Sequence, residues 1–113
     1  MQMTIEQLED GVARIVLRGR FDTTGAVQIE LPFNTAATEN RKLIADLTGV
    51  DFLASYGVRV LLMGAKIVEA KGGRLVIVCA ENNVAKVLDI AGTRSVMPVF
   101  GDTAAALAAL AQA

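Results

Sequence analysis

Two apolar runs, joined by a segment of helical periodicity, limit the fold of this chain more than any other feature. The runs cover residues 41–47 and 74–80, and neither alternates regularly between apolar and polar side chains. Such runs are typical of strands that are covered on both faces, as in a parallel sheet. Residues 58–71 lie between them and repeat apolar residues at helical spacing. The sequence therefore predicts two neighbouring parallel strands with a right-handed helical crossover.

The start of the chain predicts a hairpin. Residues 3–8 and 12–18 read as short strands, and Asp10-Gly11 lies between them. An Asp-Gly pair favours a tight turn because both central residues of that turn need a positive φ. We expect the chain to leave the sheet at residues 19–22.

The segment at residues 25–38 predicts a helix, with a threonine of the pair Thr23-Thr24 as its N-cap. Val27 and Leu31 would share its inner face at helical spacing. Pro32 lies inside the segment and lacks a backbone donor, so we expect a break or a kink near Leu31.

Capping residues and glycines mark the remaining elements. They are Gly72-Gly73 at the end of the long helix, Asn82 or Asn83 and Gly92 at the ends of a short helix, Pro98 in a short edge strand, and Asp102 before an alanine-rich terminal helix anchored by Leu107 and Leu110. The predicted order is β-β-α-β-α-β-α-β-α. We therefore expect a single α/β domain over residues 1–113, with a mixed central sheet of about five strands and about four helices.

The composition excludes several classes of partner. Hydrophobic residues make up 53% of the chain and charged residues 20%, which excludes disorder. The net charge is −1 and the basic residues are scattered, so we expect no binding to nucleic acid. No uncharged apolar run approaches the ~20 residues that span a bilayer, and the N-terminal residues contain no signal core. We expect a cytoplasmic protein without membrane insertion.

The residue types argue against catalysis. Histidine is absent, which removes the commonest general base and the commonest metal ligand. Asp46 and Asp51 could form a pair for acid–base work or a metal, but roles in the loop and in capping fit better because no further acidic residue lies nearby. The single Cys79 lies in an apolar run and predicts a buried thiol. We expect no enzymatic activity, no cofactor and no metal.

The loop before the long helix is the most informative place for function. Ser55 stands where an N-cap would stand, with a hydroxyl able to accept from the first backbone N–H groups of the helix. A helix N-terminus also favours an added phosphate. Ser55 is therefore read as a helix cap and as a candidate phosphorylation site.

The long helix has two apolar stripes. Val58, Leu61, Leu62, Ala65 and Val68 predict its core face. Tyr56, Val60, Met63 and Ile67 follow the same spacing on nearly the opposite face. Either a neighbouring helix partly covers this second stripe, or it is a contact surface for another protein.

Four segments in this order resemble the STAS family, which joins sulfate transporters with anti-sigma factor antagonists. They are GRFD at 19–22, LIADLTGV at 43–50, VDFLASYGVRVL at 50–61 and VAKVLDIAG at 84–92. The resemblance covers nearly the whole chain. It implies the STAS fold for this domain.

The resemblance also implies a phosphorylation loop. In anti-sigma factor antagonists this loop typically reads Asp-Ser-Ser/Thr-Gly, and the hydroxyl residue before the glycine is phosphorylated by a kinase that is also the anti-sigma factor. Gly57 matches the glycine and Ser55 matches the first serine. Tyr56 falls on the phosphoacceptor position and Ala54 on the aspartate, so two motif residues are changed. Ser55 and Tyr56 are the candidate phosphorylation sites.

Two functions follow from the resemblance. The first is an anti-sigma factor antagonist-like regulator, a monomer or weak dimer, that binds a cognate anti-sigma factor/serine kinase in a partner-switching system. Its partner-binding residues would be Asp22, Ser55, Tyr56, Gly57, Val60, Met63 and Ile67. The alternative is a non-phosphorylated STAS adaptor subunit of a transporter complex that binds an ABC ATPase.

Overall fold

One mixed sheet of five strands organises the protein. The computed structural model describes residues 1–112. The strands lie in the order β1-β2-β3-β4-β5. The first pair is antiparallel and the other three pairs are parallel. The strands are β1 (Gln2–Gln7), β2 (Val12–Phe21), β3 (Lys42–Leu53), β4 (Arg74–Val78) and β5 (Val99–Phe100).

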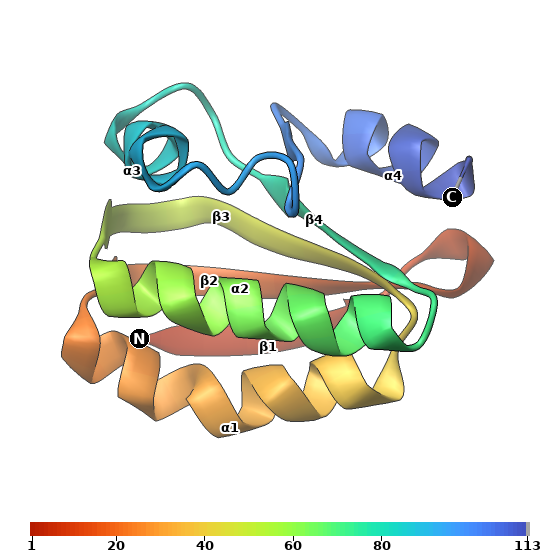
Figure 1. The fold of residues 1–113 in the computed structure, drawn as a ribbon, viewed down its shortest axis with the longest axis horizontal. Helices are drawn as coiled ribbons and strands as arrows, with labels where there is room; N and C mark the ends of the chain where they lie inside the picture. Colours follow the sequence, from red (N-terminus) through yellow and green to blue (C-terminus); the bar gives the residue numbers. More distant parts are fainter. Residues whose placement is uncertain (113) are drawn as a thin grey trace.

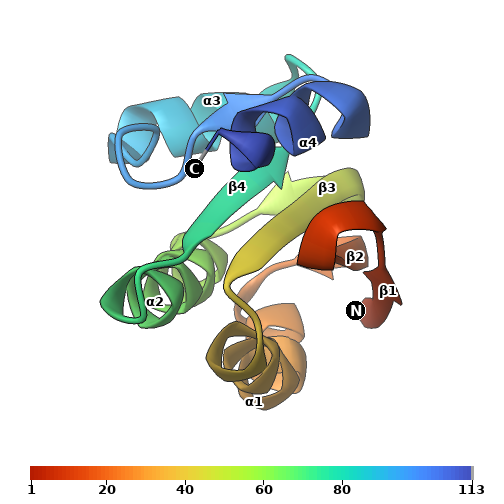
Figure 2. The same ribbon diagram turned by 90° about the vertical axis from the view of Figure 1, so that its right-hand side faces the viewer.

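Helices cover both faces of this sheet. α1 and α2 lie on one face, and α3 and α4 lie on the other (Figure 1, Figure 2). Their bounds are α1 (Thr23–Glu39), α2 (Ser55–Ala70), α3 (Asn83–Ala91) and α4 (Thr103–Ala111). The predicted order β-β-α-β-α-β-α-β-α and the α/β class are confirmed, with one short 3₁₀ turn, η1 (Glu9–Gly11), in the hairpin.

The predicted parallel unit is confirmed. β3 pairs with β4 in parallel register, from Lys42 opposite Arg74 to Asp46 opposite Val78, and α2 is the crossover. Leu61 is fully buried at the centre of the larger apolar core. Of the predicted core face of α2, only Leu62 keeps a half-buried side chain. A smaller cluster around Ile44 and Val76 lies beneath α4.

The hairpin forms as the Asp-Gly pair predicts, with φ of 56° at Asp10 and 74° at Gly11. The prediction that the chain leaves the sheet at residues 19–22 is wrong, because β2 continues to Phe21. Two register shifts against β3 extend the pairing, and Phe21 ends fully buried.

Helix α1 differs most from expectation. Its N-cap is Asp22, whose Oδ1 accepts from the Gly25 backbone N–H at 2.8 Å, and not a threonine. Val27 and Leu31 lie on the exposed face. The helix also continues through Pro32 without a break. The inner face instead consists of small residues and two large ones: Gly25, Ala26, Ile29, Phe33, Ala36 and Ala37. Small residues allow the helix backbone to approach the sheet and α2 closely.

The remaining helix ends agree with the sequence. Asn82 caps α3 by accepting from two backbone N–H groups, and Gly92 ends it in the left-handed region. Asp102 caps α4 by accepting from the Ala105 backbone N–H, and Gly72 after α2 has a φ of 80°. Cys79, just after β4, is buried as predicted.

Candidate functional site

The site lies at the end of the sheet where β2 and β3 finish and α1 and α2 begin. β3 is longer than the sequence indicated, since it runs to Leu53 and leaves only Ala54 before α2. The Ala54 backbone N–H donates to the Phe21 carbonyl oxygen at 2.9 Å. This bond fixes the start of α2 against the last residue of β2. The predicted loop is therefore almost absent, and Ser55 is held on ordered backbone.

The N-terminus of α2 has no side-chain cap. Ala54 occupies the N-cap position with extended backbone, so the prediction that Ser55 caps the helix is wrong. The reason is that α2 already begins at Ser55, so Ser55 lies one residue past the N-cap position, where it is exposed. Side chains cap the other three α-helices. At the start of α2, the first-turn amides and the exposed residue Ser55 stand together.

Gly57 sets how closely α2 approaches the sheet. A Cβ at this position would lie 2.8 Å from Cδ1 of Leu53, 2.9 Å from Cδ1 of Phe21 and 3.0 Å from the Phe21 carbonyl oxygen. These distances are shorter than ordinary carbon contacts. Gly57 is itself buried. Its contribution to the site is to let α2 pack closely against Phe21 and Leu53, which fixes the position of the exposed residues beside it.

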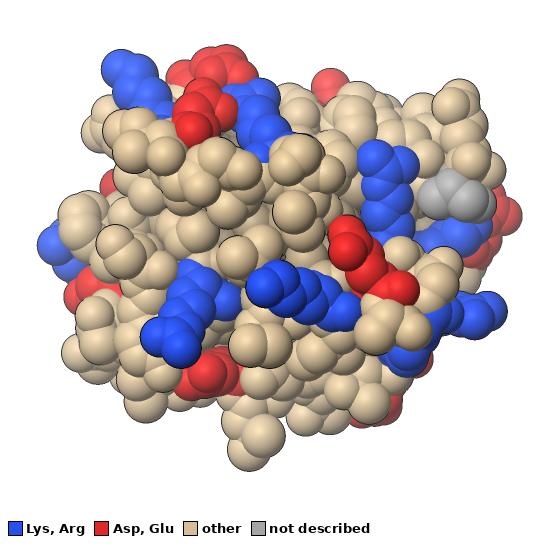
Figure 3. Space-filling view, viewed as in Figure 1, with Lys and Arg blue, Asp and Glu red and all other residues tan. Residues whose placement is uncertain are grey.

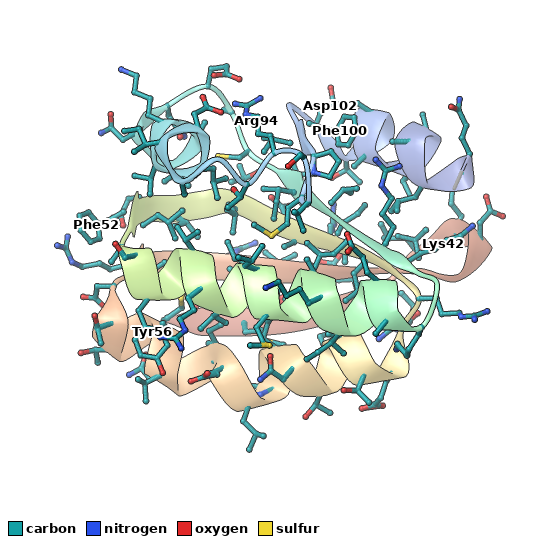
Figure 4. All side chains as sticks on the ribbon, viewed as in Figure 1. Lys42, Phe52, Tyr56, Arg94, Phe100 and Asp102 are labelled. Carbon is teal, nitrogen blue, oxygen red and sulfur yellow. The ribbon has the colours of Figure 1, made fainter. Side chains whose placement is uncertain are left out.

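Tyr56 is turned toward α1. Its hydroxyl donates to Oε1 of Glu30 at 2.9 Å, and the ring is half-buried against the core (Figure 4). The hydrogen bond to Glu30 raises the pKa of the Tyr56 phenol above its usual range. The phenol oxygen of Tyr56 is thus engaged by the neighbouring helix α1.

Arg20 and Phe52 form a further feature of this end that the sequence did not indicate. The two residues face each other across β2 and β3, and the Arg20 guanidinium lies 3.9 Å from the centre of the Phe52 ring. Phe52 is 39% exposed at the end of the molecule that also carries Tyr56 (Figure 4). Arg20 Nε also lies 3.3 Å from Oδ2 of Asp22. An aromatic ring followed closely by a helix start, with an arginine at the end of the neighbouring strand, is the signal that could have found this pair.

Asp22 joins this pair to α1. Its role as N-cap, through the Gly25 N–H, is the main reason why the pKa of the Asp22 carboxyl lies below its usual range, and the nearby Arg20 acts in the same direction. The carboxylate is half-buried. It is therefore charged at neutral pH and held in a fixed position beside Arg20.

The second stripe of α2 divides into covered and open residues. Val60 is only 2% exposed because α1 packs alongside α2, so its side chain is occupied within the fold. Ile67 is half-buried, whereas Met63 is 46% exposed. A neighbouring helix therefore covers part of the stripe, and Met63 remains open to another molecule.

A groove of about 680 Å³ begins at the same end and runs between α2 and α3. Val58, Arg59 and Leu62 line it from α2, and Val87 and Ile90 line it from α3. Ile90 is 87% exposed, the most open large apolar side chain among the described residues. Figure 3 shows this face with an uncharged strip between the charged side chains over the two helices. The groove is apolar with a basic edge at Arg59.

Asp46, one of the two acidic residues considered for chemistry, serves the local backbone. Asp46 Oδ1 accepts from the backbone N–H of Thr48 at 3.0 Å and from its hydroxyl at 2.6 Å, a local turn-like role. Within residues 1–112, no cluster of three or more His, Cys, Asp or Glu side chains has a metal-binding arrangement. Over the same residues, no helix combines the length and the apolar character that crossing a bilayer requires.

Five strands in this order, with two helices on each face and a helix N-terminus at the sheet end, define a STAS domain. The STAS domain family matches residues 4–106, and the chain belongs to that family. Two relatives share most of their length with it. BtrV of Bordetella bronchiseptica, assigned as an anti-sigma factor antagonist, is 31% identical over 96% of this chain and 94% of its own. The anti-sigma F factor antagonist of Paenibacillus polymyxa is 26% identical over 88% and 87%.

Solved structures share the fold. An anti-sigma factor antagonist from Mycobacterium paratuberculosis superimposes with a TM-score of 0.88 at 22% identity, covering 97% of this chain and 93% of its own. Unphosphorylated SpoIIAA, also an anti-sigma factor antagonist, gives a TM-score of 0.73 at 19% identity over 98% of both chains. These likenesses confirm the STAS fold that the sequence segments implied.

Proposed function

We propose that this protein is an anti-sigma factor antagonist that binds a cognate anti-sigma factor and thereby frees a sigma factor. The observation that carries the proposal is the likeness to BtrV along nearly the full length of both chains. The site geometry supports a binding role, because it offers exposed apolar and charged groups on ordered helices and strands.

We place the partner on the end of the sheet and the adjoining side of α2. Of the predicted contacts, Asp22, Ser55, Tyr56, Met63 and Ile67 keep an exposed or half-buried side chain. Gly57 would act through the close approach of α2, and Val60 is left out because it is buried. Arg20 and Phe52 join the surface, since arginine and aromatic side chains are enriched among residues that dominate binding energy.

We propose Ser55 as the residue that a partner kinase phosphorylates. Ser55 is an exposed residue, whereas the hydroxyl of Tyr56 is bound to Glu30. A phosphate would bring about −1.5 to −2 charges to the start of α2, where uncapped amides and the helix dipole favour them. The fold should therefore tolerate the modification. A partner that docks on Phe52 and Met63 would have to desolvate the phosphate, so binding should weaken.

A second candidate is the non-phosphorylated adaptor that binds a transporter ATPase. The departures from the family loop favour it: Ala54 leaves α2 without its acidic cap, and the Tyr56 hydroxyl is engaged by α1. The two functions differ in the partner protein and in whether phosphate is transferred to the chain. Partners recovered with the tagged protein in one purification therefore distinguish them.

The test is recovery of partners with the tagged protein from its own host, followed by titration of the recovered partner. For an anti-sigma factor with kinase activity, labelled ATP should transfer phosphate to wild type and to Ser95→Ala, the matched control at the other serine of the chain. Ser55→Ala should not be labelled and should still bind. Ser55→Asp should bind more weakly than wild type.

The outcomes separate the alternatives. Label that persists in Ser55→Ala and vanishes in Tyr56→Phe would move the modification to Tyr56. Recovery of an ABC ATPase with no labelled product would support the adaptor and contradict the antagonist.

A further inference from the structure

The two edges of the sheet differ in how they are protected. β5 is only two residues long and follows Pro98, so it offers little backbone to another strand. β1 is six residues long, QMTIEQ, with unbroken register from Gln2 opposite Arg18 to Gln7 opposite Ala13. Natural proteins usually protect such an edge with lysine, proline or a bulge. β1 has none of these and is open to pairing with a further strand.

The hydrogen-bond pattern shows which backbone groups of β1 are free. The Leu8 N–H donates to the Val12 carbonyl oxygen at 2.7 Å, so these opposed residues form a hydrogen-bonded pair. Hydrogen-bonded and non-hydrogen-bonded pairs alternate along an antiparallel ladder. Gln2, Thr4 and Glu6 therefore bond to β2. The N–H and C=O groups of the three alternate residues, Met3, Ile5 and Gln7, point away from β2 and are free to pair with another strand.

The same residues carry an apolar surface. Ile5 lies opposite the buried Ile15 and so faces the α1 side of the sheet, yet it is 47% exposed. A groove of about 450 Å³ separates it from α1, where Leu31 is 75% exposed beside Pro32. Figure 2 shows β1 at the edge of the sheet with α1 beneath it. An added strand at this edge would cover Ile5 and approach Leu31.

We propose that the occupant of this edge is β1 of a second copy of the chain, paired antiparallel about a two-fold axis with Ile5 opposite Ile5. In an antiparallel pair, hydrogen bonds form between opposed residues whose N–H and C=O groups both point toward the partner strand. The register must therefore place Met3, Ile5 and Gln7 of one copy opposite residues of the same set in the second copy. This register pairs Ile5 with Ile5 and Met3 with Gln7 on either side. It makes two hydrogen bonds in each of three pairs, about six in all.

Charge supports a second copy in this register. Glu6, the one charged residue of β1, falls opposite Thr4 and is ion-paired with Arg14 of its own chain. Two neighbouring registers could compete with this one. The first would place Glu6 directly opposite Glu6 of the second copy, and the second would form one hydrogen-bonded residue pair fewer. A self-complementary surface must avoid like charges on its axis, and this one does.

The dimer goes beyond the function proposed above, because its surface is separate from the partner site. An added strand would bond along the outer edge of β1, whereas the partner site proposed above lies where β2 and β3 end and α2 begins (Figure 2). Each dimer would therefore present two free partner sites on one continuous sheet.

The experiment is sedimentation equilibrium of the full chain over a concentration series, with Ile5→Lys as the test variant. Two lysines would then face each other on the axis, so the dissociation constant should rise on the order of tenfold or more. Ile90→Lys is the matched control, since it makes the same exchange at an exposed isoleucine far from β1. It should dimerise like wild type.

Residue-resolved hydrogen exchange provides the second measurement and does not depend on a variant. In wild type, the amides of Met3, Ile5 and Gln7 should become protected as concentration rises, whereas those of Thr4 and Glu6 should be protected throughout. A wild-type monomer up to about millimolar concentration would overturn the proposal. So would a dimer that Ile5→Lys leaves intact, or one whose formation leaves the exchange of Ile5 unchanged.

Discussion

Ala54→Asp should stabilise the protein, because it supplies the cap that α2 lacks. Ala54 already has cap geometry, with φ −95° and ψ 167°, close to the φ −90° and ψ −171° of Asp22, which caps α1. An aspartate there should accept from the Gly57 N–H, as Asp22 accepts from Gly25. Exchanges between alanine and a good N-cap are worth about 0.5–2 kcal/mol. For a chain of this length, about 1 kcal/mol corresponds to a rise of about 4 °C in Tm.

The assay is thermal and urea unfolding of wild type, Ala54→Asp and Ala54→Asn. Asparagine caps without a charge, so it separates the hydrogen bond from the helix dipole. The cap should hold the pKa of the new aspartate below its unfolded value, as happens to Asp22. A lowered folded pKa gives stability that is present above the unfolded pKa and is lost as pH falls through the folded pKa. The gain of Ala54→Asp should therefore shrink below about pH 4, and that of Ala54→Asn should not. An Ala54→Asp protein no more stable than wild type at neutral pH would refute the reasoning.

Three further predictions concern packing and capping. Leu61→Ala should cost on the order of 2–5 kcal/mol by leaving a cavity, and Met63→Ala much less, as measured by urea unfolding; equal losses would mean that the faces of α2 are assigned wrongly. Gly64→Ala should destabilise by about 1–3 kcal/mol in spite of better helix propensity, because its Cβ would lie 2.4 Å from Cε2 of the buried Phe33; a more stable variant would show that the two helices can separate freely. Asp22→Ala should lower Tm at neutral pH, and the difference from wild type should narrow in acid as the wild-type carboxylate is protonated; a difference independent of pH would exclude the capping charge.

Local patterns predicted those parts of the fold that depend on neighbours in sequence. The parallel unit followed from two unalternating runs, and the caps at Asn82 and Asp102 followed from residues that compete for helix N–H groups. The inner face of α1 could not be found in the same way. Its core contacts come mostly from glycine and alanine, whereas the large Val27 and Leu31 point outward. The inner face of α1 was therefore assigned wrongly from the large apolar side chains. The small residues form that face because they allow the helix to approach the sheet closely.

The candidate site shows a second limit. Val16 lies opposite Asp46, but Arg20 lies opposite Phe52, because the register between β2 and β3 shifts twice on the way. Without these shifts, Arg20 would not meet the aromatic ring. Ser55 was found at the start of α2 because a hydroxyl near a helix start is a local signal. The identity of the cap was missed by one residue, since β3 extends further than its apolar run.

The buried thiol of Cys79 can be used to measure transient opening of the native structure. Burial raises the pKa of this thiol, and its Sγ lies 3.3 Å from the Ala80 carbonyl oxygen, so little reactive thiolate meets solvent in the native state. An alkylating reagent can therefore modify it only when the structure around Cys79 opens transiently. Under fast reclosing, the labelling rate divided by that of a free thiol gives the open fraction directly. The labelling rate of Cys79 with and without a bound partner would therefore measure how far docking at α2 suppresses opening at the end of β4.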